Sequence, residues 1–384
     1  AGRLTRPALV IAPTSVAPNW LREAGRHAPG LRVHLHHGPD RGLTWPDLTT
    51  VDLIVTSYPL LLRDHVLLGR VTWSLLVLDE AQAVKNQAGK LAALVRTLPA
   101  DRRLCVTGTP LENHLGELWT QMDFVMPGLL GDSKSFTKLF RTPVEKKGDT
   151  ERQRLLSARL KPFILRRSKG EVATDLPPKT EIIERIPLGD DQTDLYEALR
   201  LVMDAKVRNA IAAKGLGRSH IIILEALLRL RQVCCDPLLL PKTGDKVGRH
   251  DRRMVGSAKR THLMQMLPGL VEEGRRILLF SQFTSMLDLI RQDLDLLGLR
   301  HVSLTGDTTD RMTPVDTFQS GGADIFLISL KAGGTGLTLT AADTVIHYDP
   351  WWNPAVEDQA TDRAHRIGQD KPVFVYRLVA DGTV

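Results

Sequence analysis

The sequence is poor in cysteine and contains no long apolar run. Its 384 residues include three cysteines, none of them spaced as in a CxxC motif. Three cysteines cannot form a disulfide framework, and the pair His36–His37 has no neighbouring cysteine or paired acid, so a zinc site is not expected. No apolar run reaches the roughly 18 residues of a membrane-spanning helix, and the first residues lack the pattern of a signal peptide. These absences favour an intracellular protein, in the cytoplasm or nucleoid of a prokaryote or the nucleus of a eukaryote.

The sequence also lacks a P-loop, the phosphate-binding motif GxxxxGK[ST]. Its nearest approach is the segment QAGK, where no glycine stands five residues before Gly89 and no hydroxyl residue follows Lys90. These 384 residues therefore do not supply the glycine-rich loop and lysine that hold nucleotide phosphates in P-loop proteins.

Basic residues outnumber acidic ones, and the excess is unevenly distributed. The sequence contains 51 lysines and arginines against 44 acidic residues, a net charge of +7. Residues 129–179 hold 13 basic and 6 acidic residues, and residues 242–260 hold 7 and 2. A charge run usually marks a solvated face, but two basic runs that flank one middle region favour a polyanionic partner such as nucleic acid.

Short apolar runs recur in two parts of the chain, with helix-like segments between them. Runs of this length that are rich in valine, isoleucine and leucine predict strands buried on both faces, and their alternation with helices predicts parallel sheets. The runs are 8–13, 53–57, 75–80 and 104–109 in the first part, and 277–282, 301–306, 325–330, 344–349 and 373–379 in the last. The predicted fold class is therefore α/β, with two sheet-containing lobes.

The middle of the chain has a helical pattern. Apolar positions at three- and four-residue spacing predict helices over 116–179 and 191–240, and two prolines begin a connector between these regions. The polar, basic segment 241–253 is predicted to be a mobile loop. The predicted segments are a first lobe over 1–180 with a helical insertion from near residue 116, a connector and second insertion over 181–255, and a second lobe over 256–384.

Polar loops follow the predicted strands. Asp79 and Glu80 end one apolar run, and loops rich in threonine, serine and glycine follow the others. The carboxyl ends of parallel strands meet at one edge of a sheet, where α/β proteins place their ligands. The two acids are explained either by a core strand that reaches solvent and caps the next helix, or by a metal-and-water site at this edge.

The order and spacing of these loops resemble those of the helicase-like ATPase core of the Swi/Snf family, within helicase superfamily 2. The segments LRRSKGEVATDLPPKTE, RLRQVCCDP and DRAHRIGQ carry the resemblance beyond the wider superfamily. It covers nearly the whole chain. It implies two RecA-like parallel-sheet lobes with family-specific helical insertions.

The resemblance implies an ATP site that uses Mg²⁺. Asp79 would organise the metal ion, and Glu80 would orient or deprotonate the attacking water. Arg363 and Arg366 would be arginine fingers, which neutralise charge on the transferring phosphoryl group. Further nucleotide-proximal positions are Gln82, Thr107, Gly108, Thr109, Gly336 and Gln359. Gln82 stands where many relatives have histidine, a change expected to alter coupling without abolishing activity.

The resemblance also implies that double-stranded DNA is bound without sequence preference, because the contacts would be made to phosphates. The candidate residues are Thr14, Ser15, Asn19 and Ser57 in the first lobe, and Gln282, Thr305, Ser329, Lys331 and Gly333 in the second. Thr338 stands where relatives often carry asparagine. For Trp351 and Trp352, contact with a base or sugar and packing between lobes both remain open.

The expected function is that of the motor core of an ATP-dependent double-stranded DNA translocase that remodels protein–DNA complexes, with a DNA-bound protein as its target. In the family the P-loop lies shortly before the segment equivalent to 8–13. The chain is therefore interpreted as a fragment of the motor that is inactive alone. A strand-separating helicase of the same superfamily and a non-catalytic DNA-binding module are the alternatives, and no membrane partner is expected.

Overall fold

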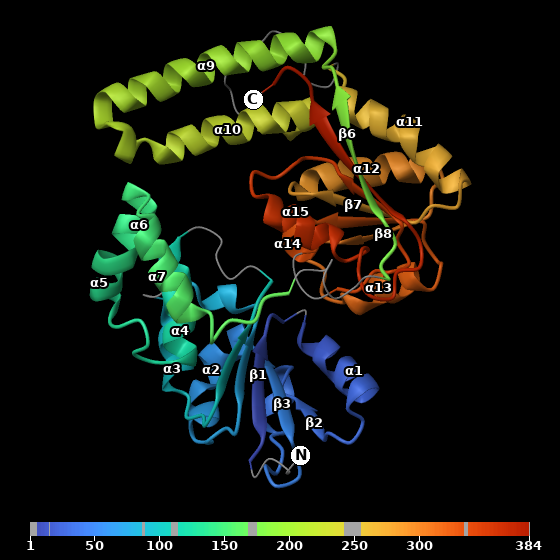
Figure 1. The fold of residues 1–384 in the computed structure, drawn as a ribbon. Helices are drawn as coiled ribbons and strands as arrows, with labels where there is room; N and C mark the ends of the chain where they lie inside the picture. The colour runs from blue at the N-terminus through green and yellow to red at the C-terminus, as the bar shows by residue number, and fades with distance from the viewer. Residues whose placement is uncertain are drawn as a thin grey trace. The chain divides into compact units, whose positions relative to one another are not determined.

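The protein, seen here as a computed structural model, divides into two compact units, each built around one parallel β-sheet (Figure 1). The first unit comprises Ala1–Thr174 with Thr335–Leu337, and the second comprises Asp175–Gly334 with Thr338–Val384. The structure describes residues 6–14, 16–86, 89–108, 114–167, 175–241, 255–333 and 337–383. Almost all of the segment predicted to be a mobile loop, 241–253, lies outside these ranges.

The first unit has a five-stranded sheet in the order β2-β3-β1-β4-β5, and every described pairing in it is parallel. Its strands are β1 (Ala8–Ala12), β2 (Val33–Leu35), β3 (Leu53–Ser57), β4 (Leu76–Asp79) and β5 (Arg103–Val106). Four of them lie at the predicted apolar runs. The prediction omits β2 because its three residues, VHL, contain no apolar run.

Both faces of this sheet are covered by helices. The side chains of β1 alternate between two hydrophobic clusters, one on each face. Leu9 and Ile11 pack in the cluster that includes residues of α2 and α3, and Val10 packs in the cluster that includes residues from the start of α1. Strand β5 departs from the predicted burial on both faces. Leu104 and Val106 are 47% and 42% exposed, because β5 is an edge strand.

Helices complete the first unit. Those that flank the sheet are α1 (Ala17–His27), α2 (Tyr58–Gly69), α3 (Lys90–Thr97) and α4 (Leu115–Val125). The predicted helical insertion continues through α5 (Ser133–Phe136), a π-helical turn (Thr137–Arg141), α6 (Thr142–Lys147) and α7 (Thr150–Leu160). Trp119, Phe136, Phe140 and Leu156 pack in one cluster, so the insertion has a hydrophobic core of its own.

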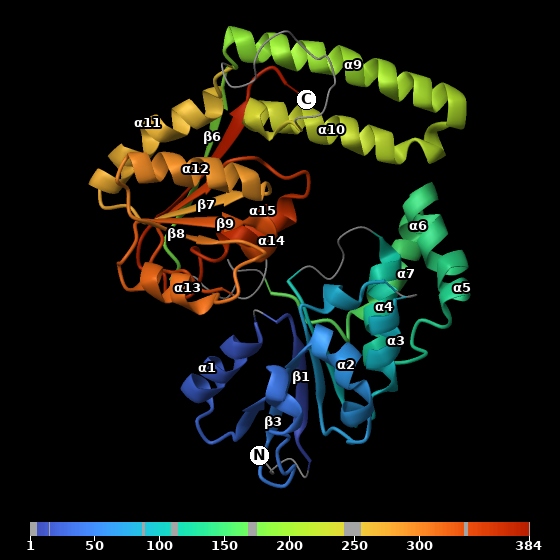
Figure 2. The same cartoon turned by 180° about the vertical axis from the view of Figure 1, so that it is seen from behind.

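The second unit has a six-stranded sheet in the order β6-β11-β10-β7-β9-β8, again with parallel pairings (Figure 2). Its strands are β6 (Lys179–Ile186), β7 (Ile277–Ser281), β8 (His301–Leu304), β9 (Ile325–Ser329), β10 (Thr344–His347) and β11 (Val373–Ala380). Strand β6 falls in the segment predicted as a connector. It pairs with β11 along its whole length and forms one edge of the sheet, so this segment belongs to the fold of the second unit.

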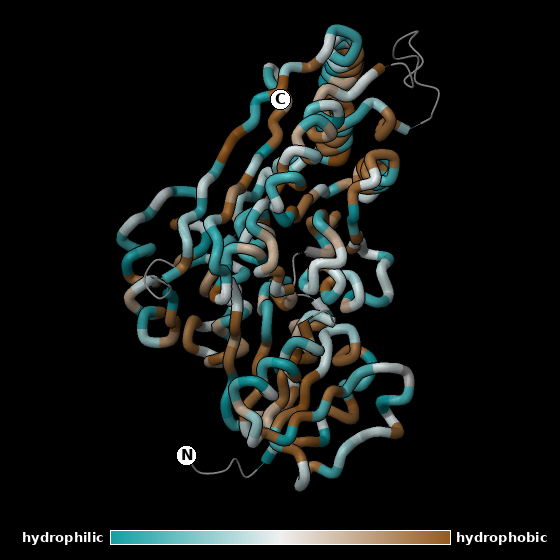
Figure 3. The backbone as a smooth tube through the Cα atoms, turned by 90° about the vertical axis from the view of Figure 1, so that its right-hand side faces the viewer, coloured by the Kyte–Doolittle hydropathy of each residue, from teal (hydrophilic) through white to brown (hydrophobic). Residues whose placement is uncertain are grey.

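Two long helices follow β6, as predicted for the second insertion. The helices of this unit are α9 (Asp190–Lys214), α10 (His220–Cys235), α11 (Ala258–Glu272), α12 (Thr284–Leu296), α13 (Met312–Gln319), α14 (Leu330–Gly333) and α15 (Pro354–Thr361). The antiparallel pair α9 and α10 encloses Leu199, Met203 and Val233 in a common cluster. Apolar and polar segments alternate along these helices, as the colouring of Figure 3 shows. Among the described residues, no helix combines the length and the apolar composition needed to cross a membrane.

Candidate functional site

The carboxylate of Asp79 lies at the carboxyl end of β4 and is held in one orientation. Trp20 of α1 donates its indole N–H to Asp79 Oδ2 at 2.8 Å, and the backbone N–H of Glu80 donates to Oδ1 at 2.9 Å. The hydroxyl of Tyr58, at the start of α2, donates to the backbone carbonyl oxygen of Asp79 at 2.8 Å. Each carboxylate oxygen accepts one of these hydrogen bonds and keeps a further lone pair that can bind a cation.

Glu80 has a left-handed backbone conformation that is unusual for a residue other than glycine. Its φ is 50° and its ψ is 55°, and among the described residues no other non-glycine residue has a positive φ. This conformation begins the short helix Ala81–Val84 and turns the chain directly after the strand. Such strain costs about 1–3 kcal/mol and is concentrated at functional sites.

A chain of hydrogen bonds joins Glu80 to the loop after β5. The side-chain amide of Gln82 donates from Nε2 to Glu80 Oε2 at 2.7 Å, and the hydroxyl of Thr107 donates to Gln82 Oε1 at 2.8 Å. The glutamine that replaces the usual histidine therefore links the predicted water-activating acid to a predicted nucleotide-proximal threonine. Gly108 follows in the same loop and is exposed, whereas Thr109 lies outside the described residues.

Tyr58 and Cys105, near Asp79 and Glu80, stay protonated at neutral pH. Burial raises the pKa of Tyr58 far above its usual range, with the charges of Asp79 and Glu80 adding to the effect, and burial raises the pKa of Cys105 to about 12. Tyr58 is therefore a permanent hydrogen-bond donor to the Asp79 backbone. Cys105 adds no negative charge at neutral pH.

The donor set fits Mg²⁺ bound with a nucleotide better than a metal ion bound by protein alone. Mg²⁺ is usually held by one or two carboxylates together with phosphate oxygens and waters. Asp79 presents one oriented carboxylate, and within the described ranges no group of three or more His, Cys, Asp or Glu residues could hold a metal ion. Asp79 would hold the ion that a nucleotide brings with it.

The polar candidates for DNA contact in the first unit also lie at the carboxyl edge of the sheet. Strands β1 and β3 are neighbours in register, with Ala12 opposite Ser57. Thr14 is exposed in the loop after β1, and Asn19 is half-buried in the first turn of α1. Ser57 is 1% exposed and its Oγ has no hydrogen-bond partner among the described residues, so its hydroxyl is enclosed in this structure. Ser15 lies outside the described residues.

The two predicted arginine fingers lie in the turns after α15, since this helix ends at Thr361 and does not include them. Arg363 is 6% exposed, and its backbone carbonyl accepts the N–H of Leu339 at 2.9 Å. Arg366 is exposed and donates from its guanidinium to Thr338 Oγ1 at 3.3 Å. The threonine that replaces the usual asparagine is thus a partner of the second finger. Gln359 is on α15, and Gly336 lies outside the described residues.

The DNA candidates of the second unit follow three neighbouring strands. Gln282, Ser329 and Thr305 come after or at the ends of β7, β9 and β8, which are adjacent in the sheet. Ser329 is 3% exposed and accepts the N–H of Ala332 on its Oγ at 3.2 Å, so it caps the short helix α14. Lys331 and Gly333 are in this helix, and Lys331 is exposed.

A buried acid that the sequence analysis did not single out holds the loop after β7. The backbone N–H of Gln282 donates to both carboxylate oxygens of Asp349, at 3.1 and 3.3 Å. Asp349 is 3% exposed, and burial raises its pKa to about 6. Nearby, the ammonium of the buried Lys259 lies 5.0 Å from the ring centroid of Tyr348. Neither the strand pattern nor the motif spacing identifies the buried residues Asp349 and Lys259, because their contacts arise only from tertiary packing.

The basic excess of the first insertion gathers in part around one pocket. Lys134, Lys138 and Lys147 line a cavity of about 520 Å³ together with Ser133, Thr137 and Thr142, and no acidic residue lines it. The π-helical turn Thr137–Arg141 contributes two of these residues. A concentration of ammonium and hydroxyl groups of this kind suits a phosphate-bearing partner.

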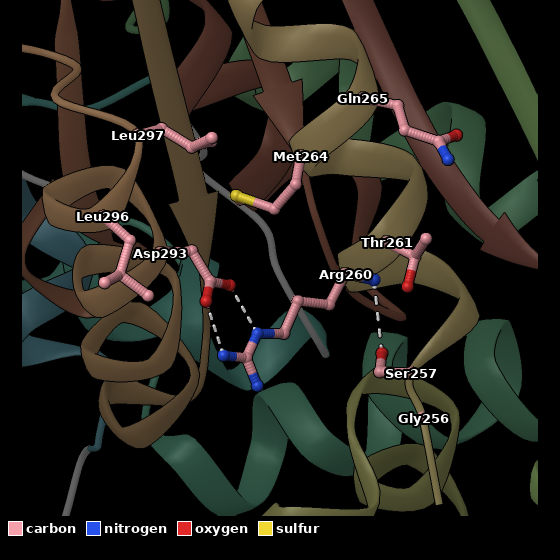
Figure 4. A pocket seen from close by; sticks show the side chains of 9 residues that line it. All are labelled: Gly256, Ser257, Arg260, Thr261, Met264, Gln265, Asp293, Leu296 and Leu297. Atoms are coloured by element: carbon pink, nitrogen blue, oxygen red, sulfur yellow. Dashed lines mark hydrogen bonds and ion pairs between the residues drawn. The ribbon is translucent and has the colours of Figure 1, made fainter.

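The pockets of the second unit lie elsewhere. One of about 510 Å³ is formed by the start of α11 and the end of α12, where Arg260 makes a bidentate ion pair with Asp293 (Figure 4). The hydrogen bond to Asp293 raises the pKa of Arg260, and it outweighs burial, which acts in the opposite direction. No predicted site residue lines any of the four described pockets.

Comparisons with known proteins agree on a family. The SNF2-related domain family matches residues 2–239, and the helicase conserved C-terminal domain family matches residues 258–368. The Bacillus subtilis protein YwqA is 40% identical over 396 residues, which cover 100% of this chain and 42% of the relative. The mouse SWI/SNF-related matrix-associated actin-dependent regulator of chromatin subfamily A member 1 is 37% identical over 392 residues, which cover 98% of this chain and 37% of the relative.

Among solved structures, the Sulfolobus solfataricus SWI2/SNF2 ATPase core in complex with double-stranded DNA is 38% identical, with a TM-score of 0.46; the match covers 100% of this chain and 78% of that chain. This chain spans about two fifths of the length of the two curated relatives. The SNF2-related match alone covers more than half of the chain, and the α/β fold with two parallel sheets agrees with the prediction. The chain belongs to the SNF2-related, or Swi/Snf, family.

Proposed function

We propose that this chain is the motor core of an ATP-dependent double-stranded DNA translocase that remodels protein–DNA complexes. The observation that carries the proposal is the pair of adjacent acids at the carboxyl end of β4. Trp20 orients Asp79, while Gln82 connects Glu80 to Thr107. Two acids held in different orientations suit two roles, one at a metal ion and one at the attacking water.

The names of the relatives support this proposal. The Bacillus subtilis relative carries the words "ATP-dependent helicase/translocase" in its name, and the mouse relative is named as a regulator of chromatin. Both are longer proteins, so their activities and partners are proposed here for the whole protein to which such a core contributes.

In the proposed reaction Mg·ATP supplies the phosphoryl group and the metal ion. Asp79 would hold the ion on its oriented carboxylate, and Glu80 would accept the proton of the attacking water. Arg363 and Arg366 neutralise charge on the transferring group, and such a residue is worth about 10³–10⁵ in rate. Arg366 is bonded to Thr338 in this structure and exchanges this neutral partner for a charged one when it acts.

For the DNA, the proposed contacts are phosphate contacts from both sheet edges. Thr14, Asn19 and Lys331 are accessible in this structure, whereas Ser57 and Ser329, the last residues of β3 and β9, are buried. Binding of this kind depends on salt, with log K falling against log salt by about 0.9 for each phosphate contact. Tight binding that ignored salt, or a strong preference for one sequence, would contradict it.

A second candidate is a DNA-binding module without catalysis, which the absence of a P-loop motif from residues 1–384 favours. A strand-separating helicase is the rival within the same superfamily. The three candidates give different results in two assays. A chimera joins a segment with the GxxxxGK[ST] motif to the start of residues 1–384, and its ATP-dependent displacement of a third strand from a triplex is measured beside the separation of a plain duplex.

A translocase displaces the third strand and leaves the duplex paired. Separation of the duplex would favour the helicase, and DNA binding without any ATP-dependent displacement would favour the module. In the same chimera, Arg366→Ala should lower kcat and spare DNA affinity, because the group acts on the transition state. Lys331→Ala should weaken DNA binding. The same phenotype for both variants would contradict the assigned roles.

A further inference from the structure

Arg231, on helix α10 of the second insertion, reaches two loops at the carboxyl edge of the second sheet. Its guanidinium donates to Gln282 Oε1 at 3.1 Å and to the backbone carbonyl oxygen of Pro350 at 2.9 Å. Its Cζ atom lies 5.1 Å from the ring centroid of Trp351. Gln282 follows β7, and Pro350 and Trp351 follow β10, the neighbouring strand. One side chain therefore joins the insertion to both loops.

The backbone of each loop is fixed by other residues. Asp349 accepts the N–H of Gln282, and Glu357 Oε1 accepts the N–H of Trp351 at 2.6 Å. Glu357 is 4% exposed and also accepts from Arg377 Nε at 3.0 Å. These two backbone contacts do not involve Arg231. Besides its bond to the Pro350 carbonyl, Arg231 contacts two side chains, the amide of Gln282 and the indole of Trp351.

The contact with Arg231 determines which way the amide of Gln282 faces. A guanidinium has only donors, so the amide must present its oxygen to it and point its nitrogen elsewhere. Gln282 Nε2 is buried and has no hydrogen-bond acceptor among the described residues. A buried donor without an acceptor is unfavourable. The amide gains a hydrogen bond once a local movement lets a phosphate oxygen reach this nitrogen.

We propose that Arg231 is a positioning residue for DNA binding by the second unit: it orients the Gln282 amide so that its N–H groups are directed to a phosphate. This inference rests on the proposed function, because it takes DNA as the ligand of the β7 loop. The inference adds that a residue of the helical insertion acts through Gln282. Lysine cannot fully replace Arg231, because an ammonium lacks the planar guanidinium that donates to two acceptors and stacks on an aromatic ring.

A double-mutant cycle on duplex-DNA affinity tests the proposal with the full 384-residue chain. Arg231→Met should weaken binding about tenfold, the effect of one hydrogen bond to a charged group. In a Gln282→Ala background, the same change should alter affinity less than about twofold, because residues that act as a unit are not additive. Arg231→Lys should restore part of the loss. Arg229→Met is the matched control, because Arg229 is on the same helix and pairs with Glu225 at 3.0 Å.

The salt dependence separates positioning from direct contact. If Arg231 only orients Gln282, Arg231→Met leaves the slope of log K against log salt unchanged in the Gln282→Ala background; a direct phosphate contact by Arg231 would lower it by about 0.9. Additive effects in the cycle, or that fall in slope, would overturn the proposal. If Arg231→Met lowers the thermal stability of the second unit, the same cycle is measured with Arg231→Lys in place of Arg231→Met, with and without Gln282→Ala. Failure of the parent chain to bind duplex DNA would instead reject the proposed function.

Discussion

At the residue scale, the candidate ATP site combines strain with precise orientation. Glu80 turns the chain in a conformation that costs an L-residue about 1–2 kcal/mol relative to the right-handed form. Its side chain is nevertheless held by Gln82. A residue that folds at a cost and is then fixed by a neighbour is typical of a position maintained for chemistry rather than for stability.

The strain at Glu80 predicts an order of stability for two variants that both lack the carboxylate. The free energy of unfolding of Glu80→Gly should exceed that of Glu80→Ala by about 0.5–1 kcal/mol, because glycine adopts a positive φ without penalty. The glycine variant should therefore unfold at a higher urea concentration. The measurement is urea unfolding of the first unit followed by fluorescence. Equal stability, or a more stable alanine variant, would show that the left-handed conformation is not retained at this position.

His347 is a buried histidine that stays neutral. It is 1% exposed, its Nε2 lies 2.9 Å from Thr361 Oγ1, and burial, reinforced by the charge of Arg377, lowers its pKa to about 3. Its ring stacks on Phe280, with centroids 5.6 Å apart. Below the pKa of an ordinary histidine, about 6.5, the unfolded chain gains a proton that the folded chain does not. Folding is therefore disfavoured as the pH falls from about 6.5 towards 3.

Replacing His347 should flatten this dependence. Between pH 6 and pH 4 the parent should lose about 1.4 kcal/mol per pH unit more than His347→Gln does, measured by urea unfolding of the second unit. Asp349 changes stability with pH in the opposite direction, because its raised pKa weakens folding as the pH rises towards 6. Since the parent and the variant both contain Asp349, its contribution cancels in the comparison. The control is His220→Gln, which changes an exposed histidine of the same unit. Parallel curves for His347→Gln and the parent would contradict the prediction.

At the scale of the element, the sequence predicts what local pattern determines. Nine apolar runs become strands, and helices form within both predicted insertions, although the first was predicted to be helical over 116–179 and its last described helix ends at Leu160. Strand β2 and strand β6 depend on neighbours in the sheet: VHL has no pattern of its own, and β6, KTEIIERI, is an edge strand with neither an apolar run nor a regular alternation. Among the site residues, motif spacing finds Asp79 and Glu80. Trp20, Asp349 and Arg231 are missed because their roles come from contacts between elements.

One serine joins helices α10 and α11, and its loss should be measurable. Ser257 caps α11 by accepting the N–H of Arg260 at 3.2 Å (Figure 4). It also donates from Oγ to the carbonyl oxygen of Cys235 at 2.7 Å. Ser257→Ala should destabilise the second unit by about 1–3 kcal/mol, because both partners are left without this bond in a buried position. Ser320→Ala, at an exposed helix end, should change stability by less than about 0.5 kcal/mol. Equal losses for the two variants would show that the cap does not join the helices.

At the scale of the whole molecule, the two units divide the proposed chemistry. The first holds the oriented acids and the second holds the arginines, so neither unit has a full set of catalytic groups. Each unit nevertheless has its own sheet and hydrophobic clusters. Two separately packed units suit a motor, because one can move as a body while its own core stays intact.

The last prediction concerns nucleotide use by residues 1–384 alone. We expect this polypeptide to bind ATP weakly and to hydrolyse it negligibly, with or without duplex DNA. Asp79 reaches a nucleotide through a metal ion, whereas the amides and lysine of a GxxxxGK[ST] loop, which cradle the phosphates, are absent from this sequence. Steady-state ATPase assays should show DNA-stimulated turnover in the chimera that carries a GxxxxGK[ST] segment ahead of residues 1–384. In that chimera Glu80→Gln should abolish turnover and spare nucleotide binding, since it removes the proton acceptor and keeps the side-chain volume. Robust DNA-stimulated hydrolysis by residues 1–384 alone would mean that the phosphates are held by residues other than those proposed.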